Sequence, residues 1–386
     1  MRGWTALVAV GVLLAGCSAG ADVSSERPEA SASATSPQAF HETDPTPPTP
    51  LRRGERIVKV GMPQAYTPKA PTTGTDDYRC FLLDPALEKA AYVTGFDVVP
   101  DRAELVHHVI LFRVPREAVA RARAIDAAEP GQGWTCFGGS GLDGADEDLD
   151  NAPWVGAWAP GGGERVMARD VGIPLDAGTQ VVMQVHYNLL EGTEADRSSV
   201  RLRLAPGTRN LAALETMLLP APVELPCRAG AAGPLCDRAA ALADVQARFG
   251  TVTGSTANYL NLVCRGQGAS PVQSCSRLVS ERATIRAVAG HMHLLGREIK
   301  IEVNPGRPDA RTVLDIPVWN FDDQGSVPVR PPVSLSPGDE LKVTCRHDQE
   351  LRDLLPSFEG QPERYVSWGE GTTDEMCLGI VLVTRP

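Results

Sequence analysis

The chain has 386 residues, with 48 acidic against 37 basic side chains and a formal net charge of −11 at pH 7. With 42% hydrophobic and 22% charged residues, the composition is that of an ordinary globular protein rather than of a disordered or membrane-spanning one. The acidic balance argues against nucleic-acid binding, because neutralising phosphates requires clustered Lys and Arg. The length predicts two or three domains.

The N-terminal residues resemble an export signal. Arg2 precedes a short apolar run, Thr5–Leu14, which is followed by Leu14-Ala15-Gly16-Cys17. The run is too short to span about 30 Å of hydrocarbon as a helix. The tetrapeptide resembles the bacterial lipobox, in which the cysteine is acylated, so we expect residues 1–17 to be a lipoprotein signal and Cys17 to carry a lipid anchor. A plain secretory signal is the alternative, and both place the protein outside the cytoplasm.

Residues 18–55 are rich in Ser, Ala, Pro, Thr and Glu and contain almost no large apolar residue. Such a segment cannot bury enough surface to offset its ordering entropy. We therefore expect a disordered tether between the anchor and the folded part of the chain.

Short β-rich runs punctuated by Gly, Pro and Asp follow the tether, a pattern typical of antiparallel sandwiches or jelly rolls. The predicted fold is all-β, with two tandem jelly-roll-like β-sandwich domains divided near Pro206, at 56–205 and 206–386. Helical character is confined to Leu235–Phe249, in an insertion of about 227–275. The expected strands are Val106–Val114, Gln180–Tyr187, Val200–Leu204, Thr284–Val288, Glu298–Val303, Glu340–Cys345 and Gly379–Val383.

Eight cysteines remain when Cys17 is set aside, and an even number in an exported protein favours four disulfides. A zinc site of thiolates requires close paired spacing, and the sequence contains no C-x-x-C. Cys80 and Cys136 are a candidate pair because both lie in the N-terminal domain. Four others surround the helical insertion and allow three connectivities, which the sequence does not rank: Cys227, Cys236, Cys264 and Cys275.

Two of the seven histidines, His291 and His293, are spaced as metal ligands would be on a strand. Residues i and i+2 share one face, so both imidazoles can reach one ion, whereas two buried and unpaired imidazoles would be costly. Met292 between them points to the other face and is expected to pack.

The remaining histidines are less clear from spacing alone. His107 and His108 are adjacent and point to opposite faces of a regular strand, so both can bind one metal only if the strand bends or ends there. His186 by itself would more often be a satisfied core histidine. His41 and His347 resemble solvated surface residues.

The histidine groups and Asp374-Glu375-Met376-Cys377 occur in the order found in one family. The chain resembles the copper type II, ascorbate-dependent monooxygenases, which include peptidylglycine α-hydroxylating monooxygenase and dopamine β-monooxygenase, from about Asp77 to Val383. Further matching stretches are Tyr78-Arg79-Cys80, Trp134-Thr135-Cys136 and Gly156-Ala157-Trp158-Ala159.

The resemblance implies two copper sites, one in each β-sandwich domain, separated by a solvent-filled cleft. His107, His108 and His186 match the site that supplies an electron. His291, His293 and Met376 match the catalytic site where dioxygen binds and the substrate C–H bond is attacked. O₂ and an ascorbate-like reductant would be co-substrates.

Ligand chemistry agrees with this resemblance. Imidazole suits copper in both oxidation states, and a soft thioether favours Cu(I), the state that binds dioxygen. Met376 has the alternative of a core methionine. A disulfide from Cys377 to Cys345 would fix the loop and favour the ligand role.

The chain departs from the peptide-amidating members at two substrate contacts, with Ala289 in place of an Arg and Ile380 in place of a Tyr. A glycine-extended peptide is therefore not the expected substrate. We expect a monomeric copper monooxygenase that hydroxylates an uncharged or extracellular small molecule. The rival is a non-catalytic copper-binding lipoprotein for sequestration or delivery, and a third hypothesis is zinc at the all-histidine site.

Overall fold

The computed structural model describes residues 47–71, 74–142 and 148–386. The chain divides into two units, Met1–Glu42 and Thr43–Pro386, and the described residues all belong to the second. The predicted signal with Cys17, most of the predicted tether and His41 lie outside the described residues. Within the described part, no helix has the length and apolar character needed to cross a membrane.

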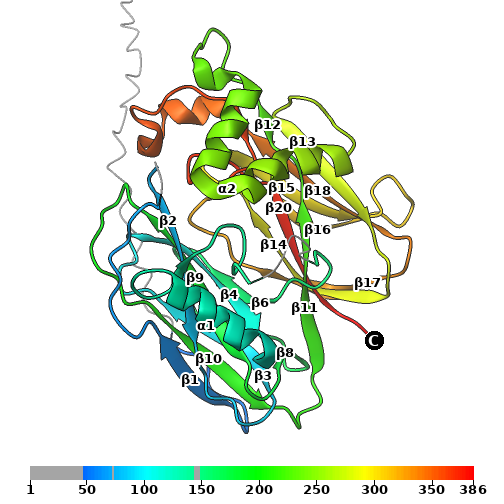
Figure 1. The fold of residues 1–386 in the computed structure, drawn as a ribbon. Helices are drawn as coiled ribbons and strands as arrows, with labels where there is room; N and C mark the ends of the chain where they lie inside the picture. Colours follow the sequence, from blue (N-terminus) through cyan, green and yellow to red (C-terminus); the bar gives the residue numbers. More distant parts are fainter. Residues whose placement is uncertain (1–46, 72–73, 143–147) are drawn as a thin grey trace, which may run out of the picture. The chain divides into compact units, whose positions relative to one another are not determined.

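The fold is all-β, as predicted, and is built from antiparallel sheets (Figure 1). A five-stranded sheet forms one layer of the first sandwich. Its central strand, β9, is buried along its whole length, because alternate side chains face two different cores. In pairing order the strands are β5 (Trp134–Thr135), β2 (Asp76–Leu83), β9 (Gln180–Asn188), β4 (Val106–Val114) and β6 (Trp154–Trp158).

One long sheet supplies the opposing layer of both sandwiches. Its two halves are joined by a short parallel pairing in which Ala212 and Ala213 lie opposite Val171 and Gly172. In pairing order the strands are β1 (Arg56–Gly61), β10 (Ser199–Pro206), β3 (Ala91–Val99), β8 (Val171–Leu175), β11 (Ala212–Pro220), β20 (Leu378–Thr384), β14 (Ala283–His291) and β17 (Val327–Leu335), and β7 (Arg165–Val166) pairs with β3.

A four-stranded sheet packs on the second half of the long sheet and completes the second sandwich. The core between them contains Val288 and Met292 from one layer and Ile299 and Val343 from the other. In pairing order its strands are β13 (Val272–Leu278), β18 (Glu340–His347), β15 (Gly296–Val303) and β16 (Arg311–Ile316), and a small separate sheet pairs β12 (Glu224–Leu225) with β19 (Val366–Ser367).

Each sandwich thus has its own hydrophobic core, although the core of the first also includes Leu214, and the long sheet continues past Pro206. The division into two domains stays a prediction. The last residues of the predicted tether already contact the folded part, since the buried carboxylate of Glu55 accepts from Arg203 (Oε2–Nε 2.7 Å).

The described part of the chain contains two α-helices, α1 (Val119–Ala128) and α2 (Arg238–Val263). The prediction that only Leu235–Phe249 is helical missed α1, whose buried Val119 and Ala122 cover the outer face of the five-stranded sheet. Asp237 caps the N-terminus of α2, because its side chain accepts from the amide of Ala240, and the helix continues to Val263. It is broken at Gly250, whose φ of 85° favours glycine.

Four disulfides join the eight cysteines, which confirms the predicted number. Cys80–Cys136 and Cys345–Cys377 pair as expected, and the insertion adopts the connectivity Cys227–Cys236 and Cys264–Cys275. Four disulfides indicate an extracytoplasmic location.

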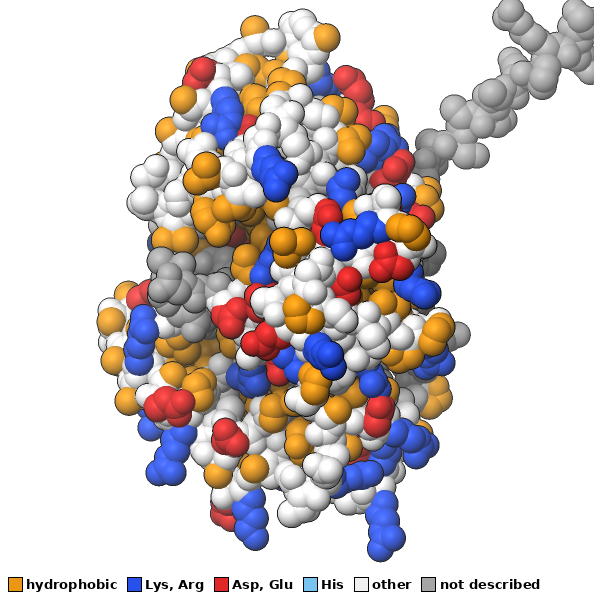
Figure 2. Space-filling model, turned by 90° about the vertical axis from the view of Figure 1, so that its right-hand side faces the viewer, with side chains coloured by type: hydrophobic (Ala, Val, Ile, Leu, Met, Phe, Trp, Pro, Cys, Tyr) orange, Lys and Arg blue, Asp and Glu red, His pale blue; other side chains and the backbone are white. Residues whose placement is uncertain are grey.

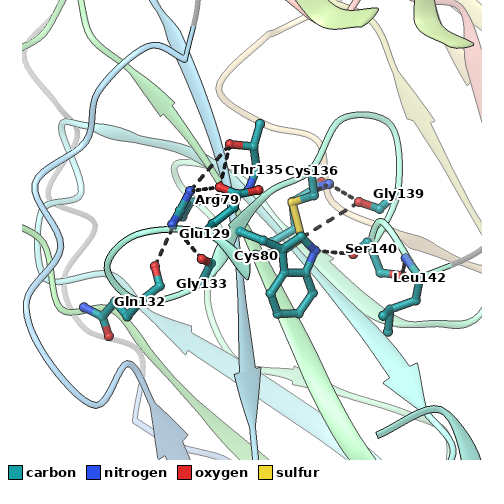
Figure 3. Close-up of a disulfide and its surroundings, with 12 residues drawn as sticks. Arg79, Cys80, Glu129, Gln132, Gly133, Thr135, Cys136, Gly139, Ser140 and Leu142 are labelled. Carbon is teal, nitrogen blue, oxygen red and sulfur yellow. Dashed lines mark hydrogen bonds and ion pairs between the residues drawn. A yellow bond between two sulfur atoms is a disulfide. The ribbon is translucent and has the colours of Figure 1, made fainter. Parts of the chain in front are cut away.

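The Cys80–Cys136 bridge lies among polar contacts that fix its loop to the sheet (Figure 3). Arg79 donates to the carboxylate of Glu129 (Nη1–Oε2 2.6 Å) and to the carbonyl of Gly133 (Nη2–O 2.6 Å). The bridge therefore ties the segment after α1 to strand β2, which also carries groups of the candidate site.

On the face drawn in Figure 2, acidic, basic and hydrophobic side chains are interspersed. Among the described residues of this face, neither sign of charge dominates.

Candidate metal centre

Three histidines of the first sandwich meet because two neighbouring strands place them opposite one another. In the pairing of β4 with β9, His108 lies opposite His186 and Val106 lies opposite Tyr187, so the register shifts and His107 is an extra residue. A bulge of this kind redirects a side chain that would otherwise point to the far face. The irregularity that two adjacent histidine ligands would require is therefore present.

The three rings turn the same type of nitrogen toward a common point. The Nδ1 of His186 lies 2.8 Å from the Nδ1 of His107 and 3.4 Å from the Nδ1 of His108. One ligand atom from each histidine lies within 4.8 Å of the other two. Neutral imidazole is a common metal ligand, so this group, which we call the first set, could hold a metal ion.

A buried carboxylate orients His186. Its Nε2 donates to Oδ1 of Asp76 (2.9 Å), which leaves Nδ1 free to face the other two rings. The same Oδ1 accepts from the backbone N–H (3.0 Å) and hydroxyl (2.7 Å) of Thr372. Tyr78 stacks on the His186 ring, with 3.9 Å between ring centroids. Asp76 thereby connects the first set to the segment that leads to Met376.

Burial favours the uncharged form of these rings. It lowers the pKa of His107 and of His108 well below the ordinary value, and the neighbouring His186 lowers both further. Burial also lowers the pKa of His186, although Asp76 opposes this. Burial alone would raise the pKa of Asp76, but the hydrogen bonds from His186 and Thr372 outweigh it and the pKa is lowered. Neutral rings are the form that binds metal.

The second set, His291 and His293, lies where β14 ends, with 5.1 Å between the ring centroids. Nδ1 of His291 donates to Oε1 of Gln324 (2.6 Å), and Nδ1 of His293 donates to the carbonyl of Asp374 (3.2 Å). Both rings therefore keep Nε2 for another partner. Burial lowers the pKa of His291 to about 3, with a further contribution from His293.

Nε2 of His107 and Nε2 of His293 are buried ring nitrogens without a hydrogen-bond partner within the described chain, as are Nδ1 of His347 and Nε1 of Trp319. A buried polar atom without a partner costs free energy, so such atoms require an explanation. Nδ1 of His293 already donates to the carbonyl of Asp374, so a metal ion bound at Nε2 would explain the unpaired nitrogen. Nε2 of His293 is therefore available to a metal ion at the second set, while the donor atoms of the first set converge on one point.

The two sets lie side by side. The ring centroid of His107 is 6.5 Å from that of His293, and that of His108 is 5.8 Å from that of His291. Phe321 also stacks on His107, with centroids 4.6 Å apart. The prediction of a solvent-filled cleft between the two sites is therefore wrong, because rings of the two sets lie next to each other. The packing of the two sandwiches brings one set against the other.

Met376 is buried and packs in an apolar cluster with Leu218, Leu260 and Trp368. This is the environment of a core methionine, and its role as a ligand stays a prediction. Met292 packs in the core of the second sandwich, which confirms the expectation for that residue.

His347 is not a solvated surface residue, and that expectation is wrong. Its ring is fully buried, and its Nε2 lies 3.2 Å from Oε2 of Glu375. It lies on β18, where alternate residues face the core, so the charged neighbours Arg346 and Asp348 do not predict its exposure.

Several residues of the site were not identified from the sequence. They are Asp76, Thr372, Gln324, Glu375 and His347. One signal was present for Asp76, because an acidic residue opens a run that is otherwise suited to a buried strand. Each of the others makes contacts with residues that are distant in the sequence.

Ala289 and Ile380, the positions of the two missing substrate contacts, lie directly opposite each other on β14 and β20. Ala289 is buried, and Ile380 packs against the apolar cluster that contains Met376. The two positions that differ from the peptide-amidating enzymes thus form one apolar surface, and Ala289 lies two residues before His291 on β14.

Comparison with known proteins assigns no family to the chain. No family model and no curated protein matches. Among solved structures, a Listeria monocytogenes protein in complex with glucose, magnesium and calcium is 11% identical, with a TM-score of 0.19; the match covers 54% of this chain and spans only 14% of that protein. The infectious bursal disease virus VP2 particle (8% identity, 86% and 71% coverage, TM-score 0.17) and allantoicase (11%, 82% and 90%, 0.16) are similarly distant. None of these likenesses carries a functional argument.

Proposed function

We propose that this protein is a copper-dependent monooxygenase that hydroxylates a C–H bond of a small molecule with O₂ and an external one-electron reductant. The observation that carries the proposal is the meeting of five imidazoles, in two sets with different surroundings, at the junction of the two sandwiches. The resemblance to the copper type II monooxygenases supplies the reaction type.

The chain's residues would divide the work between the sets. His107, His108 and His186 would hold one copper ion, and His291 and His293, with Met376, would hold the second. Bound copper would supply one-electron transfer and the activation of dioxygen. The different ligands support this division, because a thioether favours Cu(I) and an all-imidazole set suits both oxidation states.

The protein's own part is orientation and the exclusion of water. Asp76, Gln324 and the carbonyl of Asp374 each fix one ring through the nitrogen that does not face the metal position. Ala289 and Ile380 lie opposite each other, and this apolar pair would suit an uncharged group of the substrate beside His291. A lipid anchor at Cys17 would hold the enzyme at the outer side of a bacterial membrane.

Burial of the histidines favours a second candidate, a non-catalytic lipoprotein that sequesters or delivers copper. His107, His186 and His293 are almost fully buried, which restricts the access that a substrate needs. The two candidates differ in whether dioxygen is consumed.

The test is to load the metal-free protein with copper, count the bound metal by mass spectrometry and follow O₂ consumption with ascorbate. The monooxygenase requires two copper ions per chain and ascorbate-dependent O₂ consumption that is lost in His291→Ala. Two copper ions without O₂ consumption would support the carrier. A preference for zinc at the first set, or persistent consumption in His291→Ala, would contradict the proposal.

A further inference from the structure

A fully buried carboxylate lies directly behind the second set. Oε2 of Glu375 accepts from the backbone N–H of His293 (3.0 Å) and of Met376 (3.2 Å), and Oε1 accepts from the N–H of Leu295 (2.5 Å). The side chain has no exposed surface. One carboxylate therefore binds the turn that carries His293 and the loop that carries Met376.

Removing a carboxylate from water is costly unless hydrogen bonds to its charged form replace the lost solvation. Glu375 has three backbone donors and, in addition, the ring of His347, whose Nε2 lies 3.2 Å from Oε2. The same Nε2 lies 3.1 Å from the carbonyl oxygen of Met376. His347 thus contacts both the carboxylate and the backbone of the predicted ligand.

A covalent tie joins the same two segments. His347 lies on β18 two residues after Cys345, which is bridged to Cys377, the residue after Met376. The disulfide fixes where the loop meets β18. The bridge, however, does not reach His293, and Glu375 makes the connection between His293 and Met376.

We infer that Glu375 and His347 are positioning residues of the second set, which hold His293 and Met376 in register with each other. The inference rests on the proposed copper function. Neither residue touches the metal position; both act through the backbone of the predicted ligands. The seventh histidine of the sequence would serve the site without being a ligand.

A glutamine at position 375 cannot replace the carboxylate. An amide group has one acceptor oxygen, and its NH₂ group would face either the donors of His293 and Met376 or that of Leu295. The hydrogen bonds from His293 and Met376, or the one from Leu295, must therefore be lost. Changes to groups that orient ligands cost about 10- to 100-fold in metal affinity, and we expect a loss in this range at the second set.

The experiment compares Glu375→Gln, His347→Leu and His347→Gln with Glu298→Gln, a control that removes a carboxylate paired with Arg346 at the surface. Each protein is loaded with copper and dialysed against a competing chelator, and the retained metal is counted. Sulfur coordination of Cu(I) is measured by X-ray absorption. Amide exchange at His293, Leu295 and Met376 is followed in the metal-free protein.

Glu375→Gln and His347→Leu should retain one copper ion, at the first set, and lose the sulfur signal, with faster exchange at the three amides. The control should retain two. His347→Gln should restore the second ion, because its amide can donate where the ring Nε2 does. If Glu375 and His347 served only folding, their replacement would not lower copper binding at the second set and leave it unchanged at the first.

The inference would be overturned if Glu375→Gln and His347→Leu bound two copper ions with the affinity of the unchanged protein. Failure of both variants to fold would also overturn it, because the pair would then serve the fold as a whole. Failure of the unchanged protein to bind two copper ions would instead refute the proposed function, while the amide exchange would still report whether Glu375 ties the two segments.

Discussion

The ring Nε2 of His186 donates to Oδ1 of Asp76 at 2.9 Å, so its Nδ1 faces the rings of His107 and His108. The carboxylate thus selects which nitrogen is available to a metal. Because Asp76 also accepts from Thr372, one side chain orients a candidate ligand and joins segments 296 residues apart.

Replacement of Asp76 by Asn should weaken metal binding at the first set by about 10- to 100-fold, because the carboxylate that fixes His186 is lost. Competition with a chromophoric chelator measures this affinity. Asp170→Asn, which removes an exposed carboxylate paired with Arg286, is the control and should bind as the unchanged protein does. Equal affinities in the two variants would show that Asp76 does not tune the site.

The stability of the metal-free protein should fall as the pH is lowered from 6.5 towards 3. The folded-state pKa of His291, at about 3, lies below its unfolded value of about 6.5, so the unfolded chain binds the extra proton in this window. At pH 5 the loss is up to about 2 kcal/mol for this one histidine.

Urea unfolding of the metal-free protein at pH 7 and pH 5 measures this dependence. His291→Gln removes the titrating group and keeps a polar side chain, so its stability should change less between the two pH values. If His291→Gln lost as much stability between pH 7 and pH 5 as the unchanged protein does, His291 would be already protonated in the folded state or would not titrate differently on unfolding.

Met376→Leu should separate packing from ligation. The substitution preserves volume and should cost less than about 1.5 kcal/mol in the free energy of unfolding. If the thioether is a ligand, Cu(I) affinity at the second set and ascorbate-dependent O₂ consumption should fall. Met217→Leu, in the core of the second sandwich, is the matched control and should change neither. Unchanged Cu(I) binding in Met376→Leu would identify Met376 as a core residue only.

Loss of the Cys345–Cys377 bridge should destabilise the protein more than loss of Cys227–Cys236. The sequence separations are 32 and 9 residues, and loop-closure entropy predicts costs of about 4 and about 3 kcal/mol. Chemical unfolding of the two double alanine variants tests the order. The opposite order would mean that native-state strain or residual structure in the unfolded chain outweighs chain entropy.

The sequence predicted most of the local structure that supports the site. Val106–Val114 is a strand in the structure with the predicted bounds, because a dense β-branched and apolar run specifies a strand buried on both faces. The two ambiguous histidines were also informative, since their adjacency required an irregular strand and the register shifts at that point. Helix α1 was missed because its sequence, VARARAIDAA, has little helical amphipathicity.

The sequence by itself determined which residue types are available for the site: histidines on strands, cysteines that pair, and an apolar Ala289 and Ile380. Only the tertiary structure decided that the two histidine sets are neighbours, that Asp76 reaches both His186 and Thr372, and that His347 is buried. The physical reason is that alternation along a strand records which face is covered. Which groups cover that face depends on how the two sandwiches pack, and that packing joins residues hundreds of positions apart.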